Sequence, residues 1–190
     1  TMIRDISKIL CLDTEHSCYE NNNFPNDEQS DIIQIGFCWL MLPSLEITKP
    51  RTLYVRPTRS KISEYCTQLT GITPKQVASA PTLSDVCQTI IKHGTKARPW
   101  MTWGYDIEGL RQECEELNAN FPFSESYINA QDLASIILGM PLRTGLDNAL
   151  KMLDMSFEGR HHQSPDDAYN LARVVRELVV STPYRFDYKV

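Results

Sequence analysis

The feature that most constrains the fold of this 190-residue chain is a pair of long, almost wholly apolar stretches. They are KILCLDTE at residues 8–15 and DIIQIGFCWLML at residues 31–42. Side chains of an extended strand alternate between two faces, and here both faces are largely apolar. Such strands belong inside a sheet that is covered on both sides. They therefore predict an α/β domain in which helices flank the sheet.

The remaining sequence alternates between extended and helical patterns. Further strands are expected at residues 51–57, at 99–103 and, as a weaker pattern, at 127–130. Helices are expected between residues 63 and 92, with a break at LTGITP, and at 106–117, 131–138, 145–153 and from about 164 onward. The polar stretch CYENNNFPNDEQSD is expected to form a loop. Because no repeat or linker is visible, this order predicts one domain over residues 1–190, with a mixed sheet and a core from about 9 to 178.

The composition narrows the possible partners and compartment. A net charge of −5 at pH 7 disfavours broad electrostatic wrapping of a nucleic-acid duplex. The six cysteines show no CxxC pair and no zinc-type spacing, so they are expected to be reduced core residues in a reducing compartment, which favours a cytoplasmic location. The first residues lack a signal-peptide pattern, and the run IGFCWLML is too short to cross a bilayer, so no membrane partner is expected.

Two carboxylates end the first apolar strand. The alternation of side chains puts Asp13 and Glu15 on one face of the strand, together with Ile9 and Cys11. Like charges at the exit of a buried strand are costly without a counter-charge, and a divalent cation is the natural partner of oxygen ligands. A solvated strand end is the ordinary alternative for an isolated D-x-E pattern.

The last helix begins with two adjacent aspartates. Ser164 suits the N-cap, and Pro165 suits the first helical position. Both aspartates could therefore simply stabilise the start of the helix. They differ in direction, however, because Asp167 lies one turn before the apolar Leu171 and leans inward, whereas Asp166 is expected to face solvent. An inward-leaning aspartate needs a partner.

Two further residues are ambiguous when they are considered alone. Asp106 follows the fourth strand and precedes a helix, where an acid is favourable in itself. His162 stands five residues before Asp167, just outside the last helix. In chain order, the pattern is D-x-E at a strand end, D at a strand–helix junction, and H-x4-D before the last helix.

This pattern, with its flanking sequences, resembles the DEDDh 3′→5′ exonucleases and most closely their Eri-type exoribonuclease branch. CLDTE, YVRPTRSKISEYCTQLTGIT and GLDNALKMLDMSFEGRHHQSPDDAYNLARVV carry the resemblance, which extends from about residue 9 to 178. It implies an RNase H-like mixed β-sheet flanked by helices. One departure is HSC after Glu15, where many members have a small turn, and it affects the expected contacts to the terminal sugar. The residues implied for the metal site are Asp13, Glu15, Asp106 and Asp167, with His162 as general base.

The resemblance also implies the chemistry. Two divalent cations, magnesium or manganese, would be held by the carboxylates, with Asp13 bridging them, whereas zinc fits an all-oxygen set poorly. The expected partners are single-stranded 3′ ends of RNA, or of DNA, and the product is a 5′-mononucleotide. The residues implied for substrate binding are Thr14, Tyr65, Leu69, Thr70, Ile72 and Tyr105, with the two tyrosines stacking on the terminal base.

Two assignments stay open between neighbouring residues or roles. His162 is favoured over His161 as the base, because its spacing to Asp167 fits the family and neighbours in an extended segment point to opposite sides. The basic residues Arg56, Arg59 and Lys61 either follow the substrate phosphates or lie on an ordinary solvated loop.

Alternative functions stay open too. A DNA exonuclease differs from the RNA enzyme by a contact to the 2′-hydroxyl that the sequence does not reveal. A nucleic-acid-binding module without catalysis and an endonuclease are the remaining alternatives. Nothing in the sequence gives the oligomeric state.

Overall fold

A five-stranded mixed sheet forms the centre of the computed structural model, which describes residues 6–105 and 107–181. The strand order is β3-β2-β1-β4-β5. Strand β1 pairs antiparallel with β2 and parallel with β4, which in turn pairs parallel with β5. The bounds are Lys8–His16 for β1, Ile32–Met41 for β2, Arg51–Tyr54 for β3, Trp100–Thr102 for β4 and Tyr127–Asn129 for β5.

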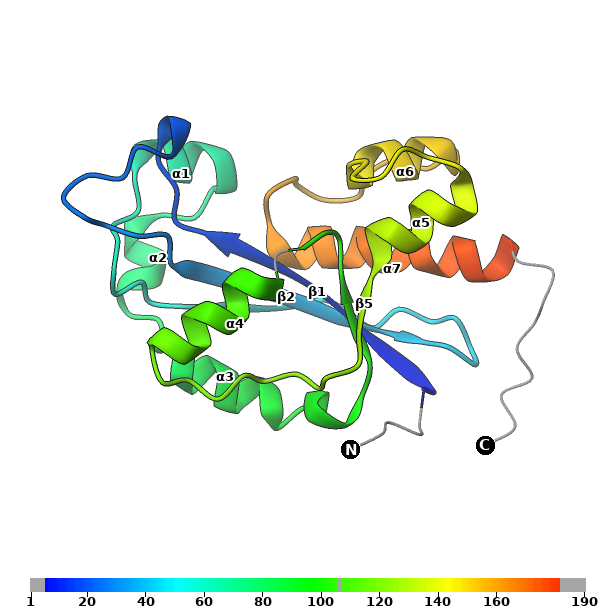
Figure 1. Cartoon of the computed structure of the whole chain (residues 1–190), viewed down its shortest axis with the longest axis horizontal. Coiled ribbons are helices and arrows are strands. Elements are labelled where there is room, and N and C mark those ends of the chain that lie inside the picture. Colours follow the sequence, from blue (N-terminus) through cyan, green and yellow to red (C-terminus); the bar gives the residue numbers. More distant parts are fainter. Residues whose placement is uncertain (1–5, 106, 182–190) are drawn as a thin grey trace.

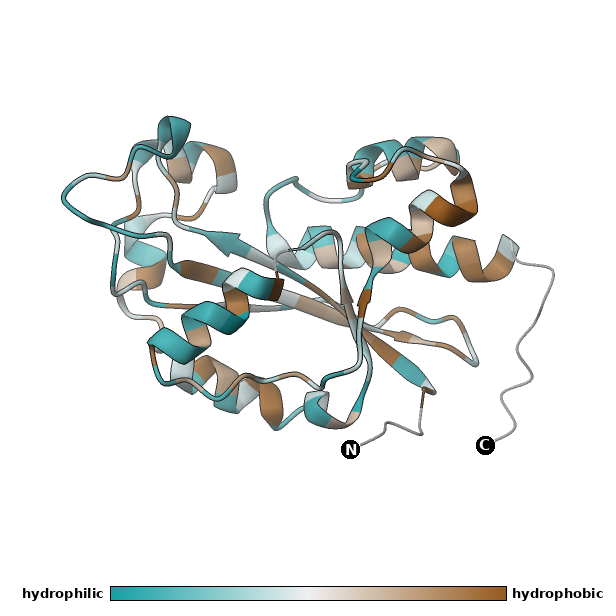
Figure 2. Cartoon of the chain, in the orientation of Figure 1, coloured by the Kyte–Doolittle hydropathy of each residue, from teal (hydrophilic) through white to brown (hydrophobic). Residues whose placement is uncertain are grey.

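Helices cover both faces of this sheet, as the apolar strands predicted (Figure 1). The helices are α1 (Glu64–Thr70), α2 (Pro74–Ala78), α3 (Leu83–Ile91), α4 (Ile107–Glu116), α5 (Ala130–Leu138), α6 (Leu146–Met152) and α7 (Ser164–Ser181), with short 3-10 turns η1 (Glu20–Asn22) and η2 (Thr95–Ala97). Leu10 and Leu12 of β1 share a buried cluster with residues of α3 and α4. Ile9 and Cys11 point the other way and share a cluster with α7. Figure 2 shows the apolar strands at the centre and the mixed hydropathy of the surrounding helices.

Local capping explains where the helices begin and end. The break at LTGITP is confirmed, because Gly71 ends α1 with a φ of 74° and Thr73 begins α2 with a capping box. The Asn129 side chain accepts a hydrogen bond from the Gln131 N–H at 3.0 Å and so caps α5 directly after β5.

Two boundaries differ from the prediction. Strand β3 ends at Tyr54 rather than 57, because the backbone N–H of Arg56 already bonds to Pro81. Helix α7 is capped by Gln163, whose carbonyl accepts the Asp167 N–H at 3.0 Å, so Ser164 is not the N-cap. A shift of one residue is common where side chains compete for the terminal backbone groups.

The thiols lie where the apolar segments predicted, mostly in the core. All six cysteines lie in the described part of the chain as free thiols, and five of them are buried. Among the described residues, no helix has the length and apolar character needed to cross a membrane.

Candidate active site

Three carboxylates gather where β1 ends and α7 begins. One oxygen each of Asp13, Glu15 and Asp167 lies within 4.8 Å of the others. The prediction that Asp13 and Glu15 share a face, and that Asp167 leans inward, is confirmed by this cluster. Glu15 is only 8% exposed, so the cluster lies in a partly desolvated setting. The fourth expected acid, Asp106, lies outside the described residues.

Strand β2 holds the start of α7 against this cluster. Gly36 lies directly opposite Asp13 in the β1–β2 register, and a Cβ at Gly36 would overlap the backbone of Ser164 and Pro165. The Gln34 side-chain carbonyl accepts hydrogen bonds from both the N–H and the hydroxyl of Ser164, each at 2.9 Å. Neither β2 residue was among the residues predicted from the sequence. A glycine inside an otherwise apolar strand was the available signal, since it marks a close backbone approach.

The Gly36→Ala variant is expected to lose about 1–3 kcal/mol of unfolding free energy, because the added methyl group overpacks a contact with backbone. It should also lose hydrolytic rate by about 10²-fold, because a shift of roughly 1 Å at the start of α7 displaces Asp167. Urea denaturation and a rate assay check both effects. Gly109→Ala is the matched control, since a Cβ there meets no atom within 4 Å. Equal behaviour of the two variants would contradict this role of Gly36.

The electrostatics of the cluster fit a cation. Burial raises the pKa of the Asp167 carboxyl to about 6, against the opposing effects of the backbone N–H of Gln163, the charge of His161 and the backbone N–H of His162. The Gln163 N–H donates to Asp167 Oδ2 at 3.1 Å. Such a raised pKa means that the folded chain disfavours the negative charge when it is metal-free. Three crowded oxygen donors of this kind match the ligand preference of magnesium and manganese.

This raised pKa predicts a pH-dependent stability in the absence of metal. Because the folded-state pKa of about 6 exceeds the ordinary value of 3.8, ionising Asp167 costs more in the folded chain than in the unfolded one. The unfolding free energy of the wild type, relative to Asp167→Asn, should therefore fall by up to about 3 kcal/mol as pH rises from 4 to 7. Urea denaturation in chelator at several pH values measures this difference. Parallel pH curves for the two proteins would contradict it.

The segment before α7 is anchored at both ends. On one side, the buried Asn170 donates to the Glu158 carbonyl at 2.8 Å and Arg173 donates to the Ser156 carbonyl at 2.8 Å. On the other side, Gln163 donates to the carbonyl of Thr70, the last residue of α1. Asp166, which was expected to face solvent, is half-buried, and its carboxylate accepts the Arg160 N–H at 2.8 Å in an exposed hydrogen bond.

The two histidines lie on this segment in different surroundings. The His161 ring stacks on Phe157 at 3.7 Å between centroids, and its Nε2 lies 3.3 Å from Asp147 Oδ1. His162 is exposed and has a φ of 60°. The segment is therefore a turn rather than an extended strand, so the argument from alternating side chains is wrong here. A positive φ is uncommon outside glycine, although histidine adopts it more readily than most residues.

The residues expected to bind substrate divide into exposed and buried groups. Tyr65 on α1 is 41% exposed and Tyr105 after β4 is 53% exposed, so neither ring is part of the core. Thr70 and Ile72 are buried, and Leu69 is half-buried. The Thr70 hydroxyl donates to the Cys66 carbonyl within α1 at 2.8 Å and accepts the Ile72 N–H at 3.0 Å, so this side chain shapes the turn that follows α1. Thr14 faces away from the carboxylates, and its hydroxyl lies 3.1 Å from His16 Nε2.

The basic segment after β3 has a structural role at Arg59. Its guanidinium bonds to Asp31 at 2.7 Å and Glu113 at 3.1 Å, and it also pairs with Glu116. The idea that Arg59 follows substrate phosphates is therefore wrong. Burial raises the pKa of Glu113 to about 7, while the Ile32 N–H and the Arg59 charge oppose that shift. The partners of Arg59 lie just before β2 and on α4. Contacts between such distant segments cannot be predicted from sequence spacing.

The site therefore consists of clustered carboxylates at the end of the central strand of a covered mixed sheet. The chain belongs to the exonuclease family, whose RNase T model matches residues 10–175. Rat 3′-5′ exoribonuclease 1 is 31% identical over 196 residues, an alignment that covers 96% of this chain and 56% of the relative. The human protein of the same name is also 31% identical, and fission yeast 3′-5′ exonuclease eri1 is 24% identical. The chain spans about half the length of the mammalian relatives.

Solved structures agree with the fold. The nuclease domain of 3′hExo, a DEDDh family member bound to rAMP, superposes with a TM-score of 0.84 at 29% identity, covering 94% of each chain. A structure of 3′-end specific recognition of histone mRNA stem-loop by 3′-exonuclease gives a TM-score of 0.82 at 27% identity. That structure's chain is longer, and the match covers 91% of this chain and 63% of that one. The predicted RNase H-like sheet flanked by helices is confirmed.

Proposed function

We propose that this chain is a 3′→5′ exoribonuclease that removes 5′-mononucleotides from single-stranded 3′ ends. The observation that carries the proposal is the cluster of Asp13, Glu15 and Asp167. It occurs on the fold shared with a nuclease domain solved with rAMP. Residues from about 9 to 178 form the single exonuclease domain in this proposal.

The same cluster supports the proposed cofactors, two magnesium or manganese ions. Asp13, Glu15 and Asp167 would hold them together with Asp106, and the set contains only oxygen donors. When bound, such ions supply neutralisation of charge on the phosphoryl oxygens and a lowered pKa of the attacking water. The chain's own contribution is to keep the three described carboxylates close together in a partly buried place.

In this proposal, His162 accepts the proton of the attacking water. The spacing of five residues to Asp167 supports it, as does the exposed position of the ring on the anchored segment before α7. His161 is already engaged by Phe157 and Asp147. A positioned base contributes about 10²–10⁴-fold in rate.

Tyr65 and Tyr105 hold the terminal base by stacking. Their exposure supports this role over core packing. The Tyr105 hydroxyl donates to Asp132 Oδ2 at 2.8 Å, which fixes one edge of the ring and leaves its faces available. Stacking on an aromatic ring accepts any base, as an exonuclease without sequence preference requires.

Tyr65→Ala and Tyr105→Ala are expected to raise KM more than they lower kcat, because the stack is already formed in the ground state. The loss of one stack costs about 1–3 kcal/mol, which corresponds to about 5- to 150-fold in KM. Steady-state kinetics on a short RNA measure this effect. Tyr105→Phe is the control that removes the bond to Asp132 and keeps the ring. Normal KM values combined with earlier melting would mean that the rings serve packing.

The preference for RNA rests on the relatives. Several of them are named exoribonucleases, and one related structure was solved with rAMP. We place the protein in the cytoplasm, because six free thiols suit a reducing compartment.

One experiment tests the proposal and its alternatives. Matched RNA and DNA oligomers of identical sequence, labelled at the 5′ end, are incubated with magnesium, with manganese or with chelator. Stepwise shortening of the RNA from its 3′ end, faster than that of the DNA and abolished by chelator, is expected. Faster cutting of the DNA oligomer would identify DNA, and not RNA, as the preferred substrate. Cleavage inside an oligomer blocked by a 3′-phosphate would indicate an endonuclease, and no cleavage in either metal would refute the proposal.

A further inference from the structure

A cavity lies just beyond the end of β4, around Tyr105. It has a volume of about 580 Å³, within the range of small-ligand sites. We call it the Arg143 pocket; its described lining residues are Trp103, Gly104, Tyr105, Glu108, Gln131 and Arg143. None of the three clustered carboxylates is among these residues. Tyr105 forms one wall of the pocket and is also the proposed stacking residue.

The topology places this pocket on the substrate side of the sheet. Strand β4 runs parallel to β1, so both strands end at the same edge, where Asp13 and Glu15 lie. Trp103 follows β4 and packs with α7 residues, on the face that also carries the carboxylates. A chain that enters the carboxylate site past Tyr105 therefore runs next to the pocket.

The arginine of the pocket is held in place by its loop. The loop between α5 and α6 is fixed at the Thr144 carbonyl, which accepts hydrogen bonds from Trp103 Nε1 and Gln131 Nε2, each at 3.0 Å. The Thr144 hydroxyl donates to the Pro141 carbonyl at 2.5 Å. Arg143 itself has a φ of 65°, a conformation that these contacts maintain. A side chain on so constrained a loop loses less freedom when it binds a ligand.

Arg143 lines the pocket, and its positive charge acts on the Tyr105 hydroxyl. The hydrogen bond to Asp132 raises the pKa of the Tyr105 hydroxyl, and the Arg143 charge opposes that shift, so the guanidinium lies within electrostatic reach of the ring. Within the described residues, Arg143 forms no ion pair, even though Glu108 lines the same pocket. A planar guanidinium without a carboxylate partner suits a phosphate group.

We propose that the Arg143 pocket is a second nucleotide subsite, in which Arg143 binds a backbone phosphate of the nucleotide next to the terminal one. This inference rests on the proposed exonuclease function. It gives Arg143 a contact that depends on the presence of a second nucleotide and not on the base sequence. Glu108 limits the affinity of this subsite, because its negative charge shares the pocket with the phosphate. A short, weakly held substrate strand agrees with the chain's net charge of −5.

The test compares substrates with and without a second nucleotide. The p-nitrophenyl ester of a nucleoside 5′-phosphate lacks it, whereas RNA oligomers of two, three and six nucleotides contain it. In Arg143→Ala, the ratio of the KM for the oligomers to the KM for the ester should rise about tenfold. The slope of log KM against log salt concentration for the six-nucleotide RNA should fall by about 0.7, the value for one lost phosphate contact on a single strand. Glu108→Gln should lower the KM for the oligomers.

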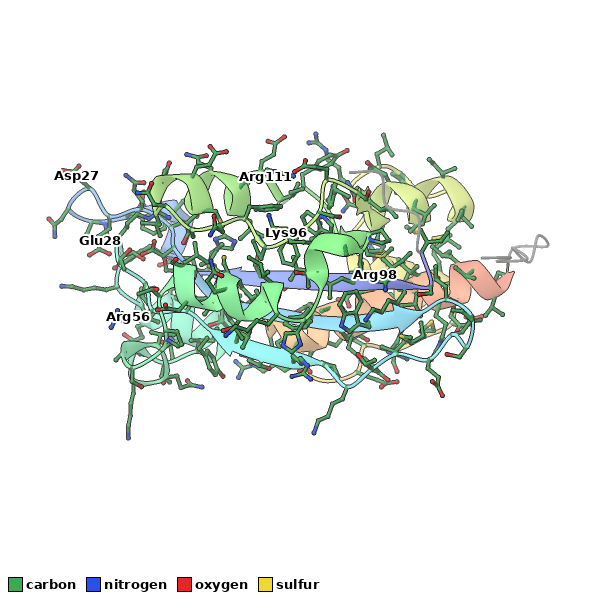
Figure 3. All side chains as sticks on the ribbon, turned by 90° about the horizontal axis from the view of Figure 1, so that it is seen from below. Asp27, Glu28, Arg56, Lys96, Arg98 and Arg111 are labelled. Atoms are coloured by element: carbon green, nitrogen blue, oxygen red, sulfur yellow. The ribbon has the colours of Figure 1, made fainter. Side chains whose placement is uncertain are left out.

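Lys96→Ala is the matched control for the loss of one positive charge. Figure 3 shows Lys96 on η2, which leads into the start of β4, at the opposite end of that strand from the pocket. This variant should leave the ratio and the salt slope unchanged. Arg143→Lys should restore the salt slope and only part of the ratio, because a lysine lacks the planar fork.

Binding of a fluorescein-labelled six-nucleotide RNA, measured by anisotropy in chelator, distinguishes a failure of the subsite from a failure of the proposed function. If the wild type hydrolyses neither substrate, the proposed function fails, and a weaker binding of Arg143→Ala than of Lys96→Ala still supports the subsite. If the wild type is active but Arg143→Ala changes the ester and the oligomers equally, or neither, the subsite is refuted.

Discussion

Asp13→Asn is expected to abolish hydrolysis while the fold stays intact. Asp13 contributes one of the three oxygens that lie within 4.8 Å of each other, and an amide there removes a negative charge that a bound cation requires. In chelator, the variant should melt at the same temperature as the wild type or higher, because removal of one charge relieves repulsion in the cluster. A rate assay at saturating magnesium and a thermal melt measure the two effects.

Asp27→Asn is the matched control for this substitution. Figure 3 shows Asp27 at the tip of the loop between β1 and β2, where the side chain is exposed. This variant makes the same chemical change without affecting the cluster, so its activity should equal that of the wild type. Retained activity of Asp13→Asn at saturating magnesium would remove Asp13 from the metal site.

His162→Ala is expected to lower kcat by about 10²–10⁴-fold, the usual contribution of a positioned base. Metal binding should persist, because the carboxylates remain. The acidic limb of the kcat–pH profile should disappear, since an imidazole accepts a proton only in its neutral form. Kinetics at saturating metal across the acidic range measure both effects.

His161→Ala is the natural comparison, because the two residues are adjacent. His161 contacts Phe157 and Asp147, so its loss should alter the segment before α7 only modestly and leave most of kcat. His161 also lowers the pKa of Asp167, which gives it a small role in the charge of the site. Equal losses in both variants, or an unchanged pH profile in His162→Ala, would show that His162 is not the general base.

The sheet and the direction of each acidic side chain were predictable because they depend on local periodicity, whereas the joining of Asp13 and Glu15 with Asp167 was implied by the family resemblance. Two strands that are apolar on both faces must be covered, and the same alternation brings Asp13 and Glu15 to one face. The inward direction of Asp167 follows from its spacing to Leu171 on α7. These features depend on neighbours within one or two turns of the chain.

The features that the sequence did not reveal depend on distant contacts. Arg59 forms ion pairs with acidic residues on α4 and just before β2. Its position in a basic segment of the sequence was therefore misleading. The N-terminus of α7 starts where Gln34 and Gly36 allow it, which moves the cap from Ser164 to Gln163. The turn at His162 is likewise set by its anchors, Asn170 and Gln163, rather than by its own residue type.

Calorimetric titration with manganese in the presence of AMP measures whether Asp13, Glu15 and Asp167 hold the divalent cations on which hydrolysis depends. Saturable binding is expected in the wild type and in Asp27→Asn, and binding at least tenfold weaker is expected in Asp13→Asn. Manganese binding of equal strength in Asp13→Asn and the wild type would contradict this expectation.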